Sequence, residues 1–300
     1  MSALVPDAMS RQDPSDTIRI GPSSLTDSSR KARMSQVSGL LPGLVVAKGT
    51  HAGQVRQRNE DSFLALDASY FGNGGLVGLA LFVVADGMGG HQDGDVASLL
   101  AARVAATHIA QDVFVPFLAG EAQSSQHRPL TETLTRSVQA ANDAVCRKVP
   151  QAGTTLTLAL VLGDSVHLAH VGDSRAYVLS DGRLQRITQD HSLAARLVQM
   201  GRAASASQET LATTPRNILY RAVGHTEAVE VDIHMHRFSH GDRLLLCTDG
   251  LWGKVTDVEI CGILTQAPDV QTAVEQLLKM ATERGGEDNM TALLVARNAP

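Results

Sequence analysis

The sequence predicts an α+β domain, and two observations carry this prediction. Short apolar segments in the second half of the chain are separated by tight-turn dipeptides, and strands joined in this way pair antiparallel. Longer segments with a 3.6-residue period are grouped between these strand blocks. This grouping argues against a doubly wound parallel sheet, in which single strands and helices alternate.

The N-terminal residues 1–42 differ in composition from the rest of the 300-residue chain. They are rich in Ser, Asp, Pro and Arg and show no lasting periodicity. Such a segment buries too little apolar surface to offset its ordering entropy, so we expect a flexible tail. Its basic cluster Arg30-Lys31-Arg33 is either simply solvated or docks a partner. Residues 43–300 are expected to form one folded domain.

In the first half of this domain, regular structure is expected to start near Leu44. The apolar run 76–85 ends abruptly at Asp86-Gly87, which indicates a buried strand followed by a tight loop. A helix is predicted over 96–117. A second helix is indicated by apolar residues that share one helical face: Leu130, Leu134, Val138, Ala141 and Val145.

The second half begins with a block of short predicted strands at 154–162, 166–171, 175–179 and 184–187. The dipeptides Gly163-Asp164 and Asp181-Gly182 suit tight hairpin turns. Residues 191–222 are expected to hold a short helix and then a Ser/Ala/Thr-rich stretch. Beyond them we predict strands at 229–235, 243–247 and 291–296, and helices at 256–266 and 269–284.

The composition narrows the class of protein. Hydrophobic residues make up 43% and charged residues 19%, as in soluble globular proteins, and the net charge of −5 argues against a general nucleic-acid binder. Three widely spaced cysteines form no zinc ribbon or disulfide framework. The longest apolar run is too short to span a bilayer, and we see no signal peptide. We therefore expect a cytoplasmic protein without membrane insertion.

Four aspartates each stand where an apolar segment ends, beside glycine or another small residue: Asp86, Asp173, Asp249 and Asp288. Each one alone also suits an ordinary turn. A carboxylate at the end of a buried strand is unfavourable unless a cation or hydrogen bonds compensate it. Four such positions together indicate a shared site for a hard cation, Mg²⁺ or Mn²⁺, because all the ligands are oxygen atoms.

An arginine-containing segment, RQRNEDSF, precedes these aspartates and begins at Arg56. The guanidinium either neutralises the carboxylates or binds phosphate oxygens. Other phosphate chemistries lack their motifs, because the chain has no GxxxxGK[ST] loop and no cysteine followed by an arginine six residues later. His234 and His236 could bind a metal, but a half-exposed edge strand explains their spacing as well.

Seven blocks in this order resemble the PPM family, the type 2C metal-dependent protein phosphatases, over residues 45–297. They are RQRNEDSF, VVADGMGGHQDGDVAS, GTTLTLALV, AHVGDSRAYVL, ITQDHS, LLLCTDGLW and GEDNMTALLV. DGMGGH in place of DGHGG is similar to the bacterial branch. The resemblance implies a four-layer α-β-β-α sandwich, with two antiparallel sheets flanked by helices. It also implies hydrolysis of phosphoserine and phosphothreonine esters by a hydroxide that bridges two Mn²⁺ or Mg²⁺ ions.

The resemblance assigns metal ligands to positions of this sequence. Asp86 is expected to bridge both cations, and Asp249 and Asp288 to complete the first metal site. The backbone carbonyl of Gly87 is expected to reach the second cation.

Further residues take supporting roles in the same family pattern. Glu60 and Asp61 are expected to act through metal-bound water. Asp173, together with Asp249, matches a weaker third metal site of bacterial members. Arg56 matches the arginine that holds the phosphate, and Arg58 is a possible substitute.

The donor of the proton to the leaving alcohol is less well defined by the resemblance. Met88 stands where DGHGG members have histidine, which leaves His91 or metal-bound water as candidates. Residues 192–216 correspond to the family's variable flap beside the cleft.

The expected partners follow from this resemblance. They are phosphorylated protein substrates and a cognate serine/threonine kinase, and we expect the protein to be a monomer. The alternative is a catalytically inactive family member that serves as a binding module. Retention of Arg56 and of the metal-binding aspartates argues against that alternative.

Overall fold

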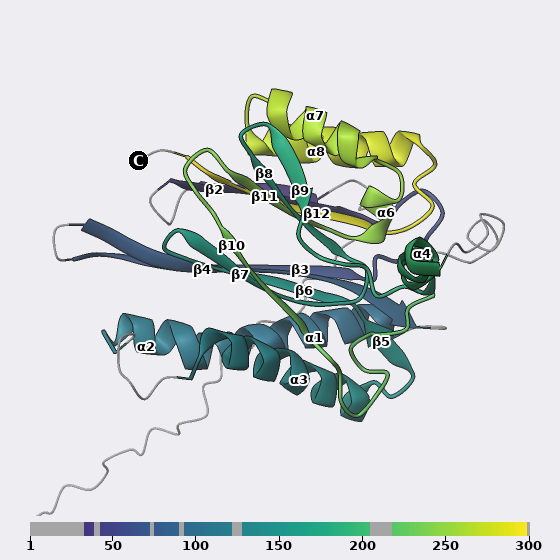
Figure 1. Cartoon of the computed structure of the whole chain (residues 1–300), viewed down its shortest axis with the longest axis horizontal. Helices are drawn as coiled ribbons and strands as arrows, with labels where there is room; N and C mark the ends of the chain where they lie inside the picture. The colour runs from purple at the N-terminus through teal and green to yellow at the C-terminus, as the bar shows by residue number, and fades with distance from the viewer. Residues whose placement is uncertain are drawn as a thin grey trace, which may run out of the picture. The chain divides into compact units, whose positions relative to one another are not determined.

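The computed structural model describes residues 33–38, 43–72, 75–89, 93–121, 128–204 and 218–298, all within the compact unit Ala32–Pro300. Two antiparallel sheets pack face to face, and helices cover the outer face of each (Figure 1). This arrangement confirms both the predicted α+β class and the four-layer sandwich that the family resemblance implied.

The first sheet has six strands, and every neighbouring pair is antiparallel. Its order across the sheet is β1 (Arg33–Ser38), β2 (Leu44–His51), β12 (Met290–Arg297), β11 (Arg243–Cys247), β8 (Arg175–Ser180) and β9 (Arg183–Arg186). Strand β12, the last in the chain, therefore lies between β2 and β11. This placement brings the two ends of the folded domain into one sheet.

The second sheet is also antiparallel and faces the first. Its order is β10 (Asp232–Arg237), β7 (Ser165–Val171), β6 (Leu156–Leu162), β4 (Gly75–Gly89) and β3 (Asp61–Gly72). The short strand β5 (Ala152–Thr154) pairs with the end of β4. The predicted hairpins are confirmed, since Gly163, Asp181 and Gly182 all adopt the positive φ angles that such turns use.

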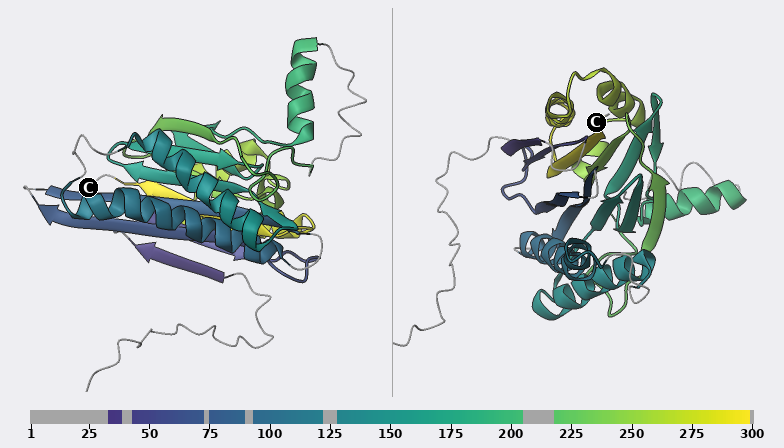
Figure 2. Two further views of the ribbon diagram at one scale, coloured as in Figure 1. Left: turned by 90° about the horizontal axis from the view of Figure 1, so that it is seen from below. Right: turned by 90° about the vertical axis from the view of Figure 1, so that its left-hand side faces the viewer.

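Two groups of helices form the outer layers. Helix α1 (Gly94–Ile109), its continuation η1 (Ala110–Phe114) and α2 (Val115–Leu118), and helix α3 (Leu130–Lys148) lie against the second sheet. Helices α7 (Asp257–Gln266) and α8 (Val270–Glu283) lie against the first sheet. The short helix α6 (Asp249–Trp252) follows β11. Helix α4 (Leu193–Ala204) extends away from the sheets (Figure 2).

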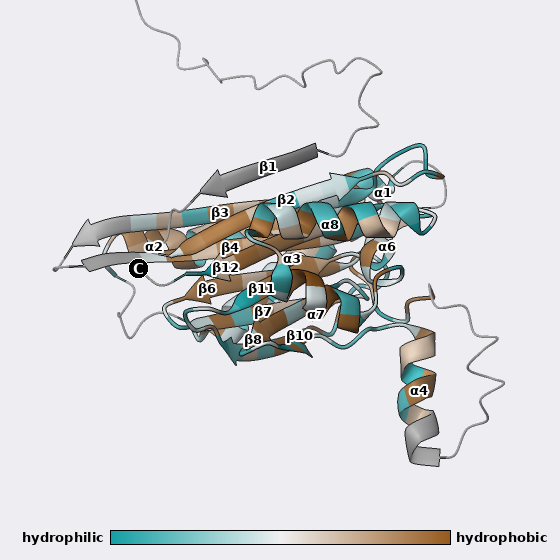
Figure 3. Ribbon diagram, turned by 90° about the horizontal axis from the view of Figure 1, so that it is seen from above, coloured by the Kyte–Doolittle hydropathy of each residue, from teal (hydrophilic) through white to brown (hydrophobic). Residues whose placement is uncertain are grey.

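Alternation along the strands explains why the sheets are covered on both faces. In β4, Leu79, Leu81 and Val83 pack under the helices, whereas Ala80 and Phe82 pack between the two sheets. Successive residues of the strand therefore alternate between the two hydrophobic cores. Figure 3 shows this difference in colour, because the central strands are mainly hydrophobic while α8 carries both hydrophilic and hydrophobic residues.

Several segments of the structure differ from the sequence analysis. Residues Arg33–Ser38, assigned to the flexible tail, form strand β1 and pair with β2. The predicted tail residues 1–32 and 39–42 lie outside the described residues. Strand β3 was not predicted, because its sequence does not alternate strictly. The helix expected over 96–117 consists of α1, η1 and α2 in succession.

The helices of the described residues include none that is both long and apolar enough to span a membrane.

Candidate active site

A cavity of about 230 Å³ lies at the end of the sandwich where strand ends from both sheets meet. Its lining includes seven of the predicted site residues: Arg56, Glu60, Asp86, Gly87, Asp173, Asp249 and Asp288. These residues come from segments far apart in the sequence. The fold therefore gathers the residues that the sequence patterns had selected separately.

Asp86 occupies a strand and not the loop that the sequence analysis expected. Strand β4 continues to Gly89 because its last residues pair with β5, and Asp86 lies opposite Asp61 of β3. The backbone N–H of Asp86 donates to Oγ1 of Thr155 at 2.9 Å. The Asp86 carbonyl accepts from the Thr155 N–H at 2.9 Å and from Thr154 Oγ1 at 2.8 Å. Hydrogen bonds on both backbone groups hold Asp86 in place.

Gly87 is required here by the close approach of α1. A Cβ atom at Gly87 would lie 2.0 Å from the carbonyl oxygen of Gly94, the first residue of α1. A Cβ atom at Gly94 would lie 2.6 Å from Oε2 of Glu60. The Gly87 N–H also donates to the Glu60 carbonyl at 3.2 Å. The two glycines thus allow Glu60 to lie next to the Asp86 strand.

Asp61 lies behind the cavity, where the two sheets meet. Its Oδ2 accepts hydrogen bonds from Oγ1 of Thr248 at 2.8 Å and from Oγ1 of Thr291 at 2.7 Å. Its Oδ1 is buried and has no hydrogen-bond partner among the described residues. Burial raises the pKa of Asp61 to about 7, and its two threonine hydrogen bonds only partly oppose this shift.

Asp173 and Asp249 lie on one side of the cavity. Asp173 follows β7, and its carbonyl accepts a hydrogen bond from Nε1 of Trp252 at 3.0 Å. The guanidinium of Arg175 lies 3.4 Å from the centre of the Trp252 ring. Burial, followed by the nearby charge of Asp249, raises the pKa of Asp173 to about 8. Burial and the charge of Asp288 raise the pKa of Asp249 to about 6.

Asp288 and its neighbour Asn289 organise the opposite side. Nη2 of Arg56 lies 2.8 Å from Oδ2 of Asp288. Oδ1 of Asn289 accepts from the Glu60 N–H at 2.8 Å, and its Nδ2 donates to the carbonyls of Ala52 and Arg58 at 2.9 and 2.8 Å. Asn289 therefore ties the loop that carries Arg56 and Glu60 to the start of β12.

Two positioning side chains were missed by sequence reasoning. Thr155 and Asn289 both stand inside the quoted blocks GTTLTLALV and GEDNMTALLV, but neither residue type suggests a metal or phosphate ligand. For Asn289 the sequence holds one signal, because this residue directly follows the candidate ligand Asp288. The contact of Thr155 with Asp86 spans 69 positions of sequence.

Two other predicted residues are not among those that line this cavity in the described part of the chain. Arg58 is exposed and does not line it, so its role in substrate binding stays a prediction. His91 lies outside the described residues.

The donor set is suited to hard divalent cations. Burial and then the charge of Asp61 raise the pKa of Asp86 well above its ordinary value, as in its neighbours. Several carboxylates thus lie close together in a partly buried cavity in which Arg56 is the one basic residue among the described lining residues. Divalent cations would compensate this negative charge. In the described ranges, no three Asp, Glu, His or Cys side chains are already placed to hold one ion. The fit therefore rests on donor chemistry and on the unpartnered Oδ1 of Asp61.

Comparisons with known proteins identify related chains. A family model described as Protein phosphatase 2C matches residues 48–295. The serine/threonine phosphatase stp of Listeria welshimeri is 35% identical over 254 residues, which cover 83% of this chain and 94% of the relative. The crystal structure of the Mycobacterium tuberculosis serine/threonine phosphatase PstP/Ppp has a TM-score of 0.67 at 34% identity, covering 85% of this chain and 99% of that one.

A second crystal structure bears on the metal site. It shows the catalytic domain of the serine/threonine protein phosphatase PstP in complex with two manganese ions. It has a TM-score of 0.63 at 35% identity and covers 84% of this chain and 97% of that one.

Proposed function

Because this chain belongs to the protein phosphatase 2C family and is a serine/threonine protein phosphatase, we propose that the 230 Å³ cavity is its active site and holds two divalent cations, Mn²⁺ or Mg²⁺. The observation that carries the proposal is the convergence of Asp86, Asp249 and Asp288 on one cavity together with Arg56. Carboxylates for cations and a guanidinium for phosphate are the two parts that hydrolysis of a phosphate ester requires.

We assign the cation-binding roles as follows. Asp86 is central, because hydrogen bonds fix both its backbone groups and it lies opposite Asp61 in the β3–β4 pair. Asp249 and Asp288 bind the first cation with Asp86, and the carbonyl of Gly87 serves the second. When bound, the cations supply positive charge and an acidified water for attack on phosphorus.

Residues around these ligands hold water and a possible third ion. Glu60 and Asp61 orient water molecules beside the cations, since the buried Oδ1 of Asp61 has no protein partner among the described residues. Asp173 and Asp249 are close enough for the charge of one to raise the pKa of the other. This proximity supports a weaker third site at that pair.

Arg56 is assigned to the phosphate. Its guanidinium contacts Asp288, so a phosphate held by Arg56 lies beside the first cation site. There the arginine binds the non-bridging oxygens and stabilises the charge that they gain in the transition state. Arg58 is exposed and is the weaker candidate for this role.

Release of serine or threonine from the substrate requires a proton. His91 is our proposed donor, and water in the cavity is the competitor. If His91 donates this proton, His91→Ala slows phosphothreonine-peptide turnover much more than p-nitrophenyl phosphate turnover, because p-nitrophenolate leaves without protonation. Equal losses on the two substrates would assign the role to water.

The test of the proposed function is phosphate release from a phosphothreonine peptide, measured with and without Mn²⁺. We expect turnover that is abolished by EDTA and restored by Mn²⁺ or Mg²⁺. Full turnover in excess EDTA, with trace metal excluded, would contradict the proposal. The alternative of an inactive binding module is not supported, because the related proteins are phosphatases and the cavity keeps its carboxylates and arginine.

The partners that we propose are phosphorylated proteins and a serine/threonine kinase that acts on the same substrates. A cytoplasmic location and a monomeric state also stay predictions. The location is supported by the three cysteines, all of which are free.

A further inference from the structure

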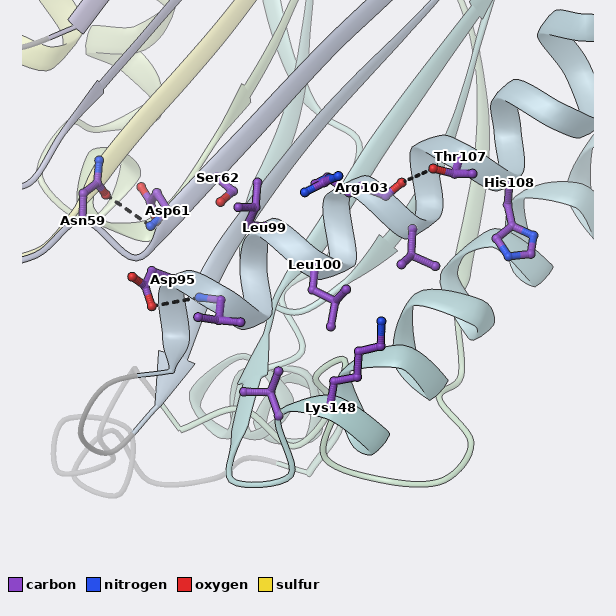
Figure 4. Close-up of a pocket in the computed structure, with 13 residues that line it drawn as sticks. Asn59, Asp61, Ser62, Asp95, Leu99, Leu100, Arg103, Thr107, His108 and Lys148 are labelled. Atoms are coloured by element: carbon purple, nitrogen blue, oxygen red, sulfur yellow. Dashed lines mark hydrogen bonds between the residues drawn. The ribbon is translucent and has the colours of Figure 1, made fainter. Parts of the chain in front are cut away.

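A larger groove lies beside the proposed active site, along the outer face of α1. Its volume is about 710 Å³, compared with about 230 Å³ for the active-site cavity. It is bounded by residues 59–62 at the start of β3, by the face of α1 from Asp95 to His108, and by Lys148 and Val149 at the end of α3. Figure 4 shows Asn59 and Asp61 at one end, His108 at the other, and Lys148 across from Leu100. We name this depression the α1 groove.

The α1 groove lies next to the active site. Asp61 lines the groove, and the preceding residue Glu60 lines the active-site cavity. At the start of α1, Gly94 packs against Gly87 of the cavity, and the next residue, Asp95, lines the groove. The α1 groove is therefore within reach of a peptide whose phosphorylated residue occupies the active site.

The sizes of the two depressions indicate which part of a protein substrate each one can accommodate. A cavity of about 230 Å³ accommodates a phosphate and the side chain that carries it, but no longer stretch of peptide. The face of α1 from Asp95 to His108 is about 20 Å long. An extended segment of about six residues has the same length.

The floor of the α1 groove is apolar and partly open to solvent. Val96 and Leu99 are 49% and 50% exposed, although both are large hydrophobic residues. Leu100 and Val104 lie beside them and also line the groove. Apolar side chains of a bound segment would cover this surface.

Two basic side chains flank the apolar floor, while two carboxylates, Asp61 and Asp95, line one end of the groove. Arg103 and Lys148 are both exposed, and neither forms an ion pair within the part of the chain that the structure describes. Most arginines in the other two depressions are paired with carboxylates, whereas Arg196 is exposed and lies 5.3 Å from the centre of the Tyr220 ring. Arg221 pairs with Glu230 and Asp232, and Arg175 pairs with Asp190. Arg103 and Lys148 are therefore available to contact carboxylates on a partner.

We propose that the α1 groove binds the segment of the phosphoprotein that flanks the phosphorylated residue, and that it selects a segment with apolar side chains and carboxylates. The apolar side chains lie over Leu99, and the carboxylates face Arg103 and Lys148. This inference rests on the proposed function, because it assigns substrate selection to a surface next to that active site.

The test compares phosphothreonine peptides that differ only in their flanks. One pair carries two leucines and two glutamates on the N-terminal or on the C-terminal side, and a matched pair has lysine in place of glutamate. The variants are Arg103→Glu/Lys148→Glu and Leu99→Ser. Arg147→Glu is the matched control, because Arg147 is exposed beside Lys148 but does not line the groove.

For the unaltered protein, we expect a lower KM for one glutamate peptide than for its lysine counterpart. In the double variant, KM for that glutamate peptide should rise about tenfold with kcat nearly unchanged, since two favourable charge contacts become repulsive. Leu99→Ser should raise KM for both peptides of that side. Arg147→Glu should change neither value, and p-nitrophenyl phosphate turnover should stay the same in every variant.

Three results would overturn the inference. One is an unchanged KM for all peptides in the double variant. Another is an equal effect of Arg147→Glu, which would indicate a general field effect. The third is a change of oligomeric state in the double variant or in Leu99→Ser, measured by size-exclusion chromatography. Such a change would indicate that the groove is an interface between copies of this chain. None of these results would disprove the proposed function, which is tested separately by metal-dependent turnover of the unaltered protein.

Discussion

Nη2 of Arg56 and Oδ2 of Asp288 lie 2.8 Å apart at the edge of the active-site cavity. The two residues are 232 positions apart in sequence. Their contact depends on the pairing of β2 with β12, in which His51 lies opposite Met290. This pairing places the proposed phosphate ligand beside a proposed cation ligand, and several predictions depend on that arrangement.

The first prediction concerns the two arginines. Arg56→Ala should lower kcat/KM for a phosphothreonine peptide by about 100-fold, because the lost guanidinium would bind the phosphate and stabilise its transition-state charge. Arg58→Ala is the matched control, since Arg58 is exposed and outside the cavity, and it should cost at most a few fold. If Arg58→Ala is the more harmful change, the phosphate role belongs to Arg58.

The second prediction concerns the central carboxylates. Asp86→Asn and Asp249→Asn should each lower kcat by orders of magnitude at saturating Mn²⁺, because each removes a cation ligand. In EDTA both variants should melt at the same temperature as the unaltered protein or above it, since the amide removes a carboxylate whose charge is disfavoured by burial. Normal turnover in either variant would refute its assignment. A lower Tm in EDTA would show that the carboxylate stabilises the fold.

The third prediction concerns pH and the metal-free protein. The pKa values of Asp61 and Asp173 are raised to about 7 and 8, so the folded protein keeps protons that the unfolded chain has released above pH 4. Stability from these groups is present at low pH and is lost as pH rises through 7 and 8. Between pH 6.5 and 8.5 in EDTA, we expect the free energy of unfolding to fall on the order of 1–2 kcal/mol.

The lower limit of this window avoids an opposing effect. Burial lowers the pKa of His170 to about 3, so the unfolded chain takes up a proton below pH 6.5 that the folded protein does not. Thermal melts at several pH values would measure the effect. Asp173→Asn should flatten the profile, and Mn²⁺ should reverse its slope. A profile that is already flat without metal would contradict the assignment of raised pKa values.

The fourth prediction concerns Thr155. Its Oγ1 accepts from the Asp86 N–H at 2.9 Å and shares a hydrogen bond with Oγ of Ser174 at 2.7 Å, so it connects the segments of Asp86 and Asp173. Thr155→Val keeps the shape but leaves the Asp86 N–H without its acceptor, at a cost of about 1–3 kcal/mol. We expect a lower Tm and weaker Mn²⁺ binding by calorimetry.

Thr155→Ser is the control for this prediction. It retains the hydroxyl, so Mn²⁺ affinity should stay within a few fold of that of the unaltered protein. If valine and serine at this position weaken Mn²⁺ binding equally, the hydroxyl does not position Asp86.

Local sequence signals were sufficient for many elements of the fold. The alternating cores on the two faces of β11 follow from the two-residue period of a strand, and the helices α3 and α8 follow from their 3.6-residue period. The turn at Asp181-Gly182 follows from residues that tolerate positive φ. Such signals depend only on neighbouring residues, so these elements can be predicted without knowledge of the rest of the chain.

Strand pairing could not be obtained in the same way. Strand β3 has no strict alternation, and it is fixed by its pairing with β4 along its own whole length. The extension of β4 through Asp86 depends on β5, which is more than 60 residues away in sequence. These features depend on contacts between distant segments, whose register no local period specifies.

By itself, the sequence determined the class of the domain, the family, and the residue types that bind cations and phosphate, because these are carried by local patterns and ordered motifs. Only the tertiary structure decided how they combine. It placed Asp61 behind the cavity, where Asp61 accepts hydrogen bonds from Thr248 and Thr291, and it set the α1 groove beside the active site. Long-range packing sets these relationships, and the free energy that fixes them comes from cores and hydrogen bonds shared between segments far apart in the chain.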